Sequence, residues 1–143
     1  MRVQQILGQK GNDGVITMKP GTSVAEAVAL LSGKRIGAVI ISDGGAPRGI
    51  LSERDIVREL GRRGAKCLDD HVETMMTKDL ITCAPDDDAH DVLTKMTEGR
   101  FRHMPVIEGG EMVGLISIGD VVKARLAELS MERDALEGMV RGF

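Results

Sequence analysis

Apolar residues in the first half of the chain follow a spacing that changes from one stretch to the next. Residues 15–18 predict a short strand, and the apolar positions within residues 24–31 recur at helical spacing. Ser23 stands where the cap of this helix is expected, and Glu26, three residues later, completes a capping box. Gly33 follows the last apolar position, so the helix is predicted to end there.

A hairpin and a second helix are predicted next. Residues 38–41 form a continuous apolar run, which indicates a buried strand. The Asp-Gly-Gly sequence at 43–45 is typical of a hairpin turn, so residues 49–51 are expected to form the partner strand. Residues 53–60 then predict a helix. These elements give one unit of the order β-α-β-β-α.

The second half of the chain repeats this order. Moving the sequence by 65 positions places Thr17 on Thr82 without a gap, and it superposes turn glycines, apolar strand residues and one Ser-x-x-Asp frame. Such agreement indicates an internal repeat. The identical pairs include Ile16/Ile81, Pro20/Pro85, Arg35/Arg100, Gly49/Gly114, Ser52/Ser117, Asp55/Asp120 and Val57/Val122. The second copy therefore predicts strands at 80–82, 103–107 and 112–116, a turn at 108–110, and helices at 89–98 and from 118.

The repeat sets the expected organisation of the chain. A single copy would leave an apolar sheet face exposed, so two copies are expected to pack face to face about an approximate two-fold axis. The fold class is then α/β, with two pseudo-two-fold-related β-α-β-β-α units. The expected parts are an N-terminal helical segment at 1–12, units at 13–61 and 78–126, a basic linker at 62–77, and a C-terminal helical tail at 127–143.

Composition narrows the class of protein. Of the 143 residues, 42% are hydrophobic and 29% are charged, which is typical of a globular domain. Phe101 and Phe143 are the only aromatic residues, and the net charge is −3, so nucleic-acid binding is disfavoured. The sequence shows no signal peptide and no apolar run long enough for a membrane span, which predicts a cytoplasmic protein without a membrane partner. Cys67 and Cys83 fit no metal signature and are expected to be reduced thiols.

No catalytic constellation is recognisable in the sequence. Phosphate-loop, dinucleotide-binding and metalloprotease motifs are missing, and the three histidines have no spacing typical of a metal site. The acidic run at 86–88 precedes a predicted helix, where carboxylates favour the positive end of the helix dipole. We therefore expect a protein that is not an enzyme and that has no catalytic cofactor or metal.

The most informative feature is the junction where a strand runs into a helix, at 49–55 in the first copy and 114–120 in the second. One interpretation is structural, because serine at the N-cap and aspartate at N3 form a capping box. The other is functional, because a helix N-terminus offers free N–H groups to a phosphate and a carboxylate suits the two hydroxyls of a ribose. Arg54 favours an anion at the first junction, and Gly119 allows close approach of a ligand at the second.

The second strand of each copy is expected to form the other wall of the site. In the second copy, Pro105 cannot donate a ladder hydrogen bond, so it predicts a strand edge or a bulge that leaves backbone near Met104 free for a base. Arg102 and His103 have the charge to reach phosphates, although a solvated basic rim is the alternative. The first copy lacks these basic groups, so the two sites are expected to differ in ligand or affinity.

These features together resemble the tandem CBS-domain family, also called the Bateman module, and in particular its small stand-alone bacterial members. The resemblance covers about residues 10–126. It rests on Ile81-Thr82 with Pro85, on 101–106 and 114–120, on the matching positions Thr17, Pro20, 36–39 and 52–55 of the first copy, and on the connecting segment 72–77.

The resemblance implies a regulatory, energy-sensing module that binds adenosine-containing nucleotides such as AMP, ATP or NAD(H) in clefts between the two units. It also implies a homodimer and an unidentified regulated protein. A ligand-free structural or partner-binding dimerisation module is the alternative. The nucleotide-binding residues expected on this basis are Thr17, Lys19, Gly37, Ala38, Val39, Ser52, Arg54, Asp55, Arg58, Ile81, Thr82, Arg102, His103, Met104, Pro105, Ser117, Ile118, Gly119 and Asp120.

Overall fold

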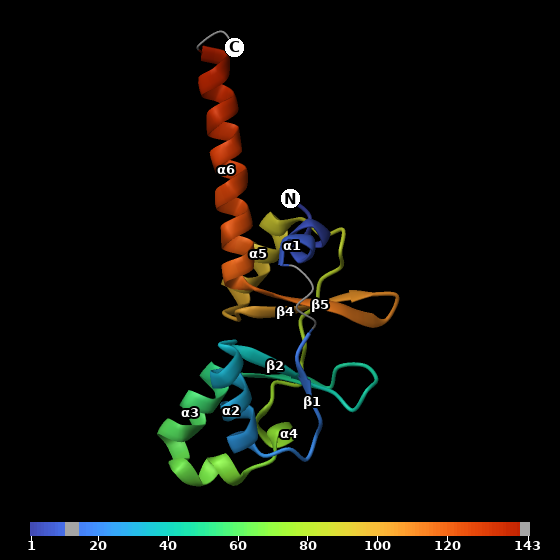
Figure 1. Ribbon diagram of the computed structural model, residues 1–143, viewed down its shortest axis with the longest axis vertical. Helices are drawn as coiled ribbons and strands as arrows, with labels where there is room; N and C mark the ends of the chain where they lie inside the picture. Colours follow the sequence, from blue (N-terminus) through green and yellow to red (C-terminus); the bar gives the residue numbers. More distant parts are fainter. Residues whose placement is uncertain (11–14, 141–143) are drawn as a thin grey trace. The chain divides into compact units, whose positions relative to one another are not determined.

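The computed structural model describes residues 1–10 and 15–140, and it divides into two compact units (Figure 1). Unit 1 consists mainly of Gly14–Ile81, and unit 2 mainly of Met1–Asp13 with the chain from Thr82 onward. The predicted boundary between residues 12 and 13 and the last three residues of the predicted C-terminal tail lie outside the described residues. The other predicted domain boundaries stay predictions.

Unit 1 is a three-stranded sheet covered by helices, as the spacing of its apolar residues predicts. The strand order is β1-β2-β3, with β1 parallel and β3 antiparallel to the central β2. Every residue of β2 is buried, as expected for a continuous apolar run. The elements are β1 (Thr17–Met18), α2 (Val24–Lys34), β2 (Ala38–Ile41), β3 (Gly49–Ser52), α3 (Glu53–Arg63), the 3-10 helix η1 (Ala65–Asp69) and α4 (Val72–Met75).

Unit 2 has the same core elements around a two-stranded sheet. The predicted strand at 80–82 is wrong, because only an isolated parallel bridge between Cys83 and Val106 forms there. The amide of Cys83 donates to the carbonyl of Pro105, and the amide of Ile107 donates to the carbonyl of Cys83. The strand edge that was expected to be free beside Pro105 is therefore hydrogen-bonded to Cys83. The elements are α1 (Val3–Lys10), α5 (Ala89–Gly99), β4 (His103–Glu108), β5 (Glu111–Ser117) and α6 (Ile118–Val140).

Each unit is completed by a short helix from outside the 65-residue repeat. The amide of Val72 in α4 donates to the carbonyl of Thr22, and the amide of Val3 in α1 donates to the carbonyl of Asp87. Thr22 and Asp87 are repeat equivalents, so α1 occupies on unit 2 the place that α4 occupies on unit 1. Moving the sequence by 69 positions superposes Val3, Ile6 and Leu7 on Val72, Met75 and Met76. The N-terminal segment and the linker are therefore a second pair of repeated elements.

The first helix of unit 1 was predicted to end at Gly33, but it continues to Lys34. Arg35 ends the helix in the left-handed conformation, with φ 54°, and Ile36 donates its amide to the carbonyl of Leu31. Arg100, the repeat equivalent of Arg35, ends α5 in the same way, with φ 57°. The helix end is therefore set by a backbone conformation that an arginine adopts in both copies.

Replacing Arg35 with glycine is expected to stabilise the protein. A left-handed residue with a Cβ atom costs about 1–2 kcal/mol, and glycine removes most of that cost despite its greater freedom in the unfolded chain. We expect a gain of about 1 kcal/mol in the free energy of unfolding, measured by urea denaturation. Arg35→Ala is the matched control, because alanine keeps the Cβ atom. A glycine variant no more stable than the alanine variant would contradict this account.

Candidate functional site

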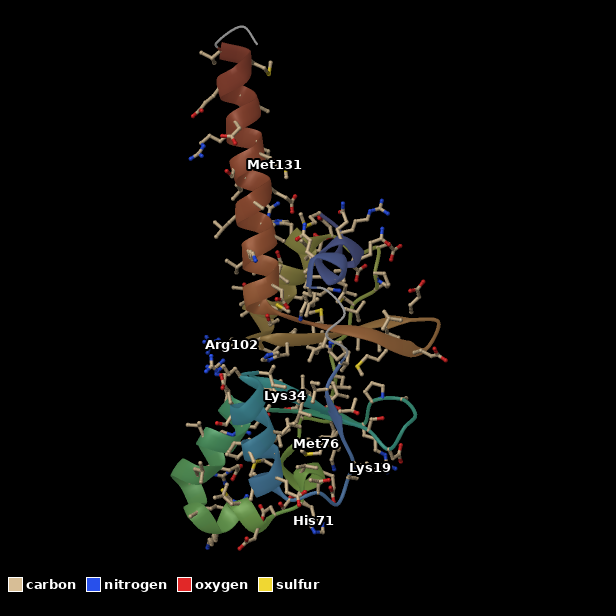
Figure 2. All side chains as sticks on the ribbon, in the orientation of Figure 1. Lys19, Lys34, His71, Met76, Arg102 and Met131 are labelled. Carbon is tan, nitrogen blue, oxygen red and sulfur yellow. The ribbon has the colours of Figure 1, made fainter. Side chains whose placement is uncertain are left out.

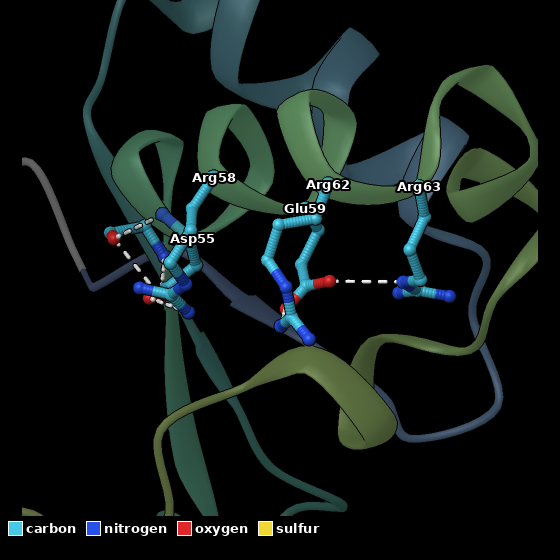
Figure 3. Close-up of polar contacts among 6 residues, drawn as sticks. Asp55, Arg58, Glu59, Arg62 and Arg63 are labelled. Carbon is cyan, nitrogen blue, oxygen red and sulfur yellow. Dashed lines mark hydrogen bonds and ion pairs between the residues drawn. The ribbon is translucent and has the colours of Figure 1, made fainter.

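The junction of unit 1 lies where β3 runs directly into α3. The amide of Asp55 donates to Ser52 Oγ (3.3 Å), while the amide and hydroxyl of Ser52 both donate to Asp55 Oδ2 (3.0 Å each). Arg58 pairs with the other carboxylate oxygen of Asp55 at 3.2 Å (Figure 3). The capping-box interpretation is therefore confirmed here, and Asp55 is a buried carboxylate whose two oxygens both have partners.

The junction of unit 2 repeats this arrangement, with a different cation beside the carboxylate. Ser117 donates its amide to Asp120 Oδ2 (2.9 Å), and Asp120 donates its amide to Ser117 Oγ (3.1 Å). Lys10, at the end of α1, places its ammonium 2.8 Å from Asp120 Oδ2 and 2.8 Å from the carbonyl oxygen of Leu115. Burial raises the pKa of Asp120, but the hydrogen bonds from Lys10 and Ser117 outweigh it, so this pKa lies below its ordinary value.

The backbone at each junction leaves one amide unused at the positive end of the helix. The first amide of α3, from Glu53, donates to the carbonyl of Gly37 (2.9 Å). In unit 2, Ile118 donates to the carbonyl of Arg102 (2.7 Å). The amide of the next residue, Arg54 or Gly119, has no acceptor among the described residues. An anion at this point would meet a free N–H donor and the helix dipole together.

The basic residues that follow the first junction are paired with carboxylates. Glu59 accepts from Arg62 (3.1 Å) and from Arg63 (2.9 Å) (Figure 3). Arg63 also reaches Asp70 (2.6 Å). The hydrogen bond from Arg63 is the main cause that lowers the pKa of Glu59. These pairs tie the end of α3 to the segment before α4, which gives the basic linker a structural role.

Other predicted residues of unit 1 lie away from the junction or inside the core. Ala38 and Val39 are buried, and Ala38 pairs with Ser52 across the sheet. Thr17 is exposed on β1 and pairs with Ile40. β1 runs parallel to β2 with Met18 beside Ile41, so Lys19 lies near the C-terminal end of β2. Ser52 pairs with Ala38 at the other end of β2. The register therefore does not bring Lys19 to the junction.

The predicted residues of unit 2 divide in a similar way. Met104 and Pro105 are buried, and Met104 belongs to the hydrophobic core. Arg102 is exposed and is labelled in Figure 2, while His103 is half-buried. Ile81 and Thr82 are exposed and lie outside any strand. The junction thus gathers Ser117, Ile118, Gly119, Asp120 and the backbone of Arg102, and the sequence interpretation missed Lys10.

The two cysteines are free and buried, one in each unit. No group of metal-ligating side chains occurs in residues 1–10 and 15–140. Cys67 and Cys83 are free and buried, and burial raises the pKa of Cys83 to about 11, so it is a thiol at neutral pH. Among the helices of the described segments, none combines the length and the apolar character needed to cross a membrane.

A model of the CBS-domain family matches residues 11–62 and 72–127 of the chain. An uncharacterised 17.7 kDa protein of Acidianus ambivalens is 33% identical over 133 residues, which is 92% of this chain and 77% of that protein. The chain spans only 23% of one similar CBS-domain-containing protein of Arabidopsis thaliana and 61% of another, a mitochondrial one.

Solved structures agree with the family match. A CBS-domain-containing protein from Agrobacterium tumefaciens is 43% identical, with a TM-score of 0.84, covering 87% of this chain and 99% of that chain. A CBS-domain protein from Pyrobaculum aerophilum, solved in complex with AMP, is 26% identical, with a TM-score of 0.77, covering 92% of this chain and 99% of that chain. The chain thus has the mixed α/β fold of a CBS pair.

Proposed function

The chain belongs to the CBS-domain family, and we propose that it is a regulatory sensor that binds an adenosine-containing nucleotide at its two strand-to-helix junctions. AMP, ATP and NAD(H) are the nucleotides that we expect. The observation that carries the proposal is that each junction contains both an unused helix amide and the carboxylate of the Ser-x-x-Asp frame.

The chemistry of each junction suits the two ends of such a ligand. The unused amide of Arg54 or Gly119 would donate to a phosphate oxygen, and the exposed side chain of Arg54 would add a charge at unit 1. The carboxylates of Asp55 and Asp120 would accept hydrogen bonds from the ribose hydroxyls. The AMP complex of the related Pyrobaculum aerophilum protein supports this ligand class.

A thermal-shift panel with AMP, ADP, ATP, NAD, NADH and S-adenosylmethionine tests the proposal. A ligand that binds only the folded state at 100 times its dissociation constant adds about 2.7 kcal/mol to stability. We expect at least one nucleotide to raise the melting temperature, and inorganic phosphate alone to raise it much less. The absence of any shift at millimolar nucleotide would contradict the proposal.

Lys10→Met is expected to strengthen binding of adenosine at the second junction. The ammonium of Lys10 occupies Asp120 Oδ2, the atom that a ribose hydroxyl needs, so adenosine must displace it. Because both side chains are partly solvated, the pair is worth less than about 1 kcal/mol, and we expect a gain of about three-fold in affinity. Calorimetric titration with adenosine, which has no phosphate to attract Lys10, measures this gain.

Lys19→Met is the matched control for Lys10→Met. Lys19 is exposed, and the sheet register does not bring it to the junction. Its loss is therefore expected to leave adenosine affinity unchanged. Equal affinities for adenosine in the wild type and in Lys10→Met would contradict competition between the lysine and the ribose.

A ligand-free scaffold is the second candidate function. The observation in its favour is that both capping boxes are complete without a ligand. In that case the module would act through association, as a homodimer or with a regulated protein. Purified protein without nucleotide absorbance, together with a negative thermal-shift panel, would favour this function over nucleotide sensing.

A further inference from the structure

The C-terminal helix α6 carries an apolar face that its own unit leaves uncovered. Its first turns pack on unit 2, where Val121 and Ala124 are buried. The rest of the helix continues past α5 and α1 of the same unit, and Met131 in Figure 2 lies in this outer part. Leu126 and Leu136 are both 63% exposed there. Large apolar side chains exposed along one helix mark a surface for association.

The exposed apolar residues of α6 follow the spacing of a coiled coil. Steps of three, four, three and four residues separate Leu126, Leu129, Arg133, Leu136 and Val140, and Arg133 is the one polar residue of this series. This spacing places the five residues in a single seam along the helix, which we call the α6 seam. Apolar positions every 3.5 residues on average favour supercoiling with a second helix that has the same repeat.

A parallel pair of α6 helices would bring like charges together. Arg133 would meet Arg133 of the other helix in the apolar seam. Glu132, which flanks the seam, would lie beside Glu137 of the other helix, once on each side of the pair. Three like-charge contacts in so short a coil disfavour this orientation.

An antiparallel pair removes most of these contacts. When Leu126 of one helix lies opposite Leu136 of the other, Arg133 meets Leu129 rather than another arginine. Lys123 then faces Glu137 of the other helix at each end of the overlap, which replaces repulsion with two attractive pairs. One like-charge contact remains, between Glu132 of one helix and Glu132 of the other, near the two-fold axis of the pair. We infer that the α6 seam pairs antiparallel with the α6 seam of a second molecule of this chain.

Mass measurement with matched variants tests the seam. Analytical ultracentrifugation of the wild type is expected to show association, and Leu136→Glu is expected to weaken it at least tenfold. Ala135→Glu adds the same charge at an exposed position that is next to Leu136 in the sequence but outside the seam, and it should associate like the wild type. Because residues 135 and 136 are both exposed, neither change disturbs the core. A monomeric wild type, or equal association of both variants, would overturn the proposal.

Disulfide formation distinguishes the two orientations. Leu126→Cys and Leu136→Cys are prepared separately, mixed under reducing conditions and then oxidised; the native Cys67 and Cys83 are buried. The antiparallel pair predicts a crosslinked dimer from the mixture and almost none from either variant alone. Crosslinking of Leu126→Cys with itself would overturn the antiparallel arrangement. Nucleotide affinity of Leu136→Glu should equal that of the wild type, so this proposal and nucleotide sensing fail independently.

Discussion

Replacing Asp55 or Asp120 with alanine is expected to reduce nucleotide affinity at the altered junction by about 100-fold. A ribose would give two hydrogen bonds to the carboxylate, and hydrogen bonds to a charged group contribute about 1.5–3 kcal/mol each. Two such bonds at the lower end of this range are worth about 3 kcal/mol together, which corresponds to a factor of a little more than 100 in the dissociation constant. Calorimetric titration of each variant with the nucleotide that gives the largest thermal shift measures the change.

Stability separates a binding role from a capping role for these carboxylates. Loss of the cap alone costs about 1 kcal/mol of stability, and this cost is expected in both variants. Asp91→Ala is the matched control, because Asp91 is an exposed carboxylate in the first turn of α5, outside either junction. It should lose a little stability and no affinity. If Asp55→Ala and Asp120→Ala were both less stable yet bound nucleotide like the wild type, the aspartates would be caps only.

The repeat could be predicted because the features that define it depend on residues close together in the sequence. The Gly49 and Gly114 positions, the hairpin turns and the Ser-x-x-Asp frames each depend on nearby residues, so their spacing survives in the sequence. The predicted end of α2, at Gly33, is one residue too early, because glycine is the usual residue in the left-handed conformation and here Arg35 adopts it. The strand at 80–82 was inferred from its equivalent in the first copy, and only a single bridge forms there.

The candidate site was predictable only in part, because its polar groups come from distant parts of the chain. The Ser52–Asp55 and Ser117–Asp120 contacts lie within four residues, and the capping box is one of the two interpretations that the sequence offers for them. Lys10 reaches Asp120 across 110 positions because α1 packs on unit 2. The similarity of α1 to α4 is the signal that would have placed Lys10 near this junction, but it covers only a few apolar residues. The two junctions therefore differ in the cation beside the carboxylate, which is Arg58 in unit 1 and Lys10 in unit 2. The sequence alone predicted a difference between the two sites, but it attributed that difference to the basic residues beside the second strand.

Replacing Gly49 with alanine is expected to destabilise the protein by about 2 kcal/mol, within the range for overpacked sites. A Cβ atom at this position would meet the side chain of Met76, with Cγ at 2.7 Å, and the carbonyl oxygen of Thr77 at 2.9 Å. Thr77 pairs with Ile50 through both of its backbone groups, so this carbonyl cannot move without breaking the bridge to β3. Urea denaturation monitored by circular dichroism measures the loss.

Gly114→Ala, the repeat equivalent, is expected to cost less than Gly49→Ala. Its Cβ atom would meet only the end of the Leu7 side chain, at 2.7 Å from Cδ2, and a leucine end can move more easily than a backbone carbonyl. Gly33→Ala is the control, because a Cβ atom there meets nothing within 4 Å and alanine favours the helix by about 0.5–1 kcal/mol. We therefore expect the order of stability Gly33→Ala, wild type, Gly114→Ala, Gly49→Ala. Equal losses of stability in Gly49→Ala and Gly114→Ala would contradict this order. They would show that the backbone beside β3 moves as readily as the Leu7 side chain.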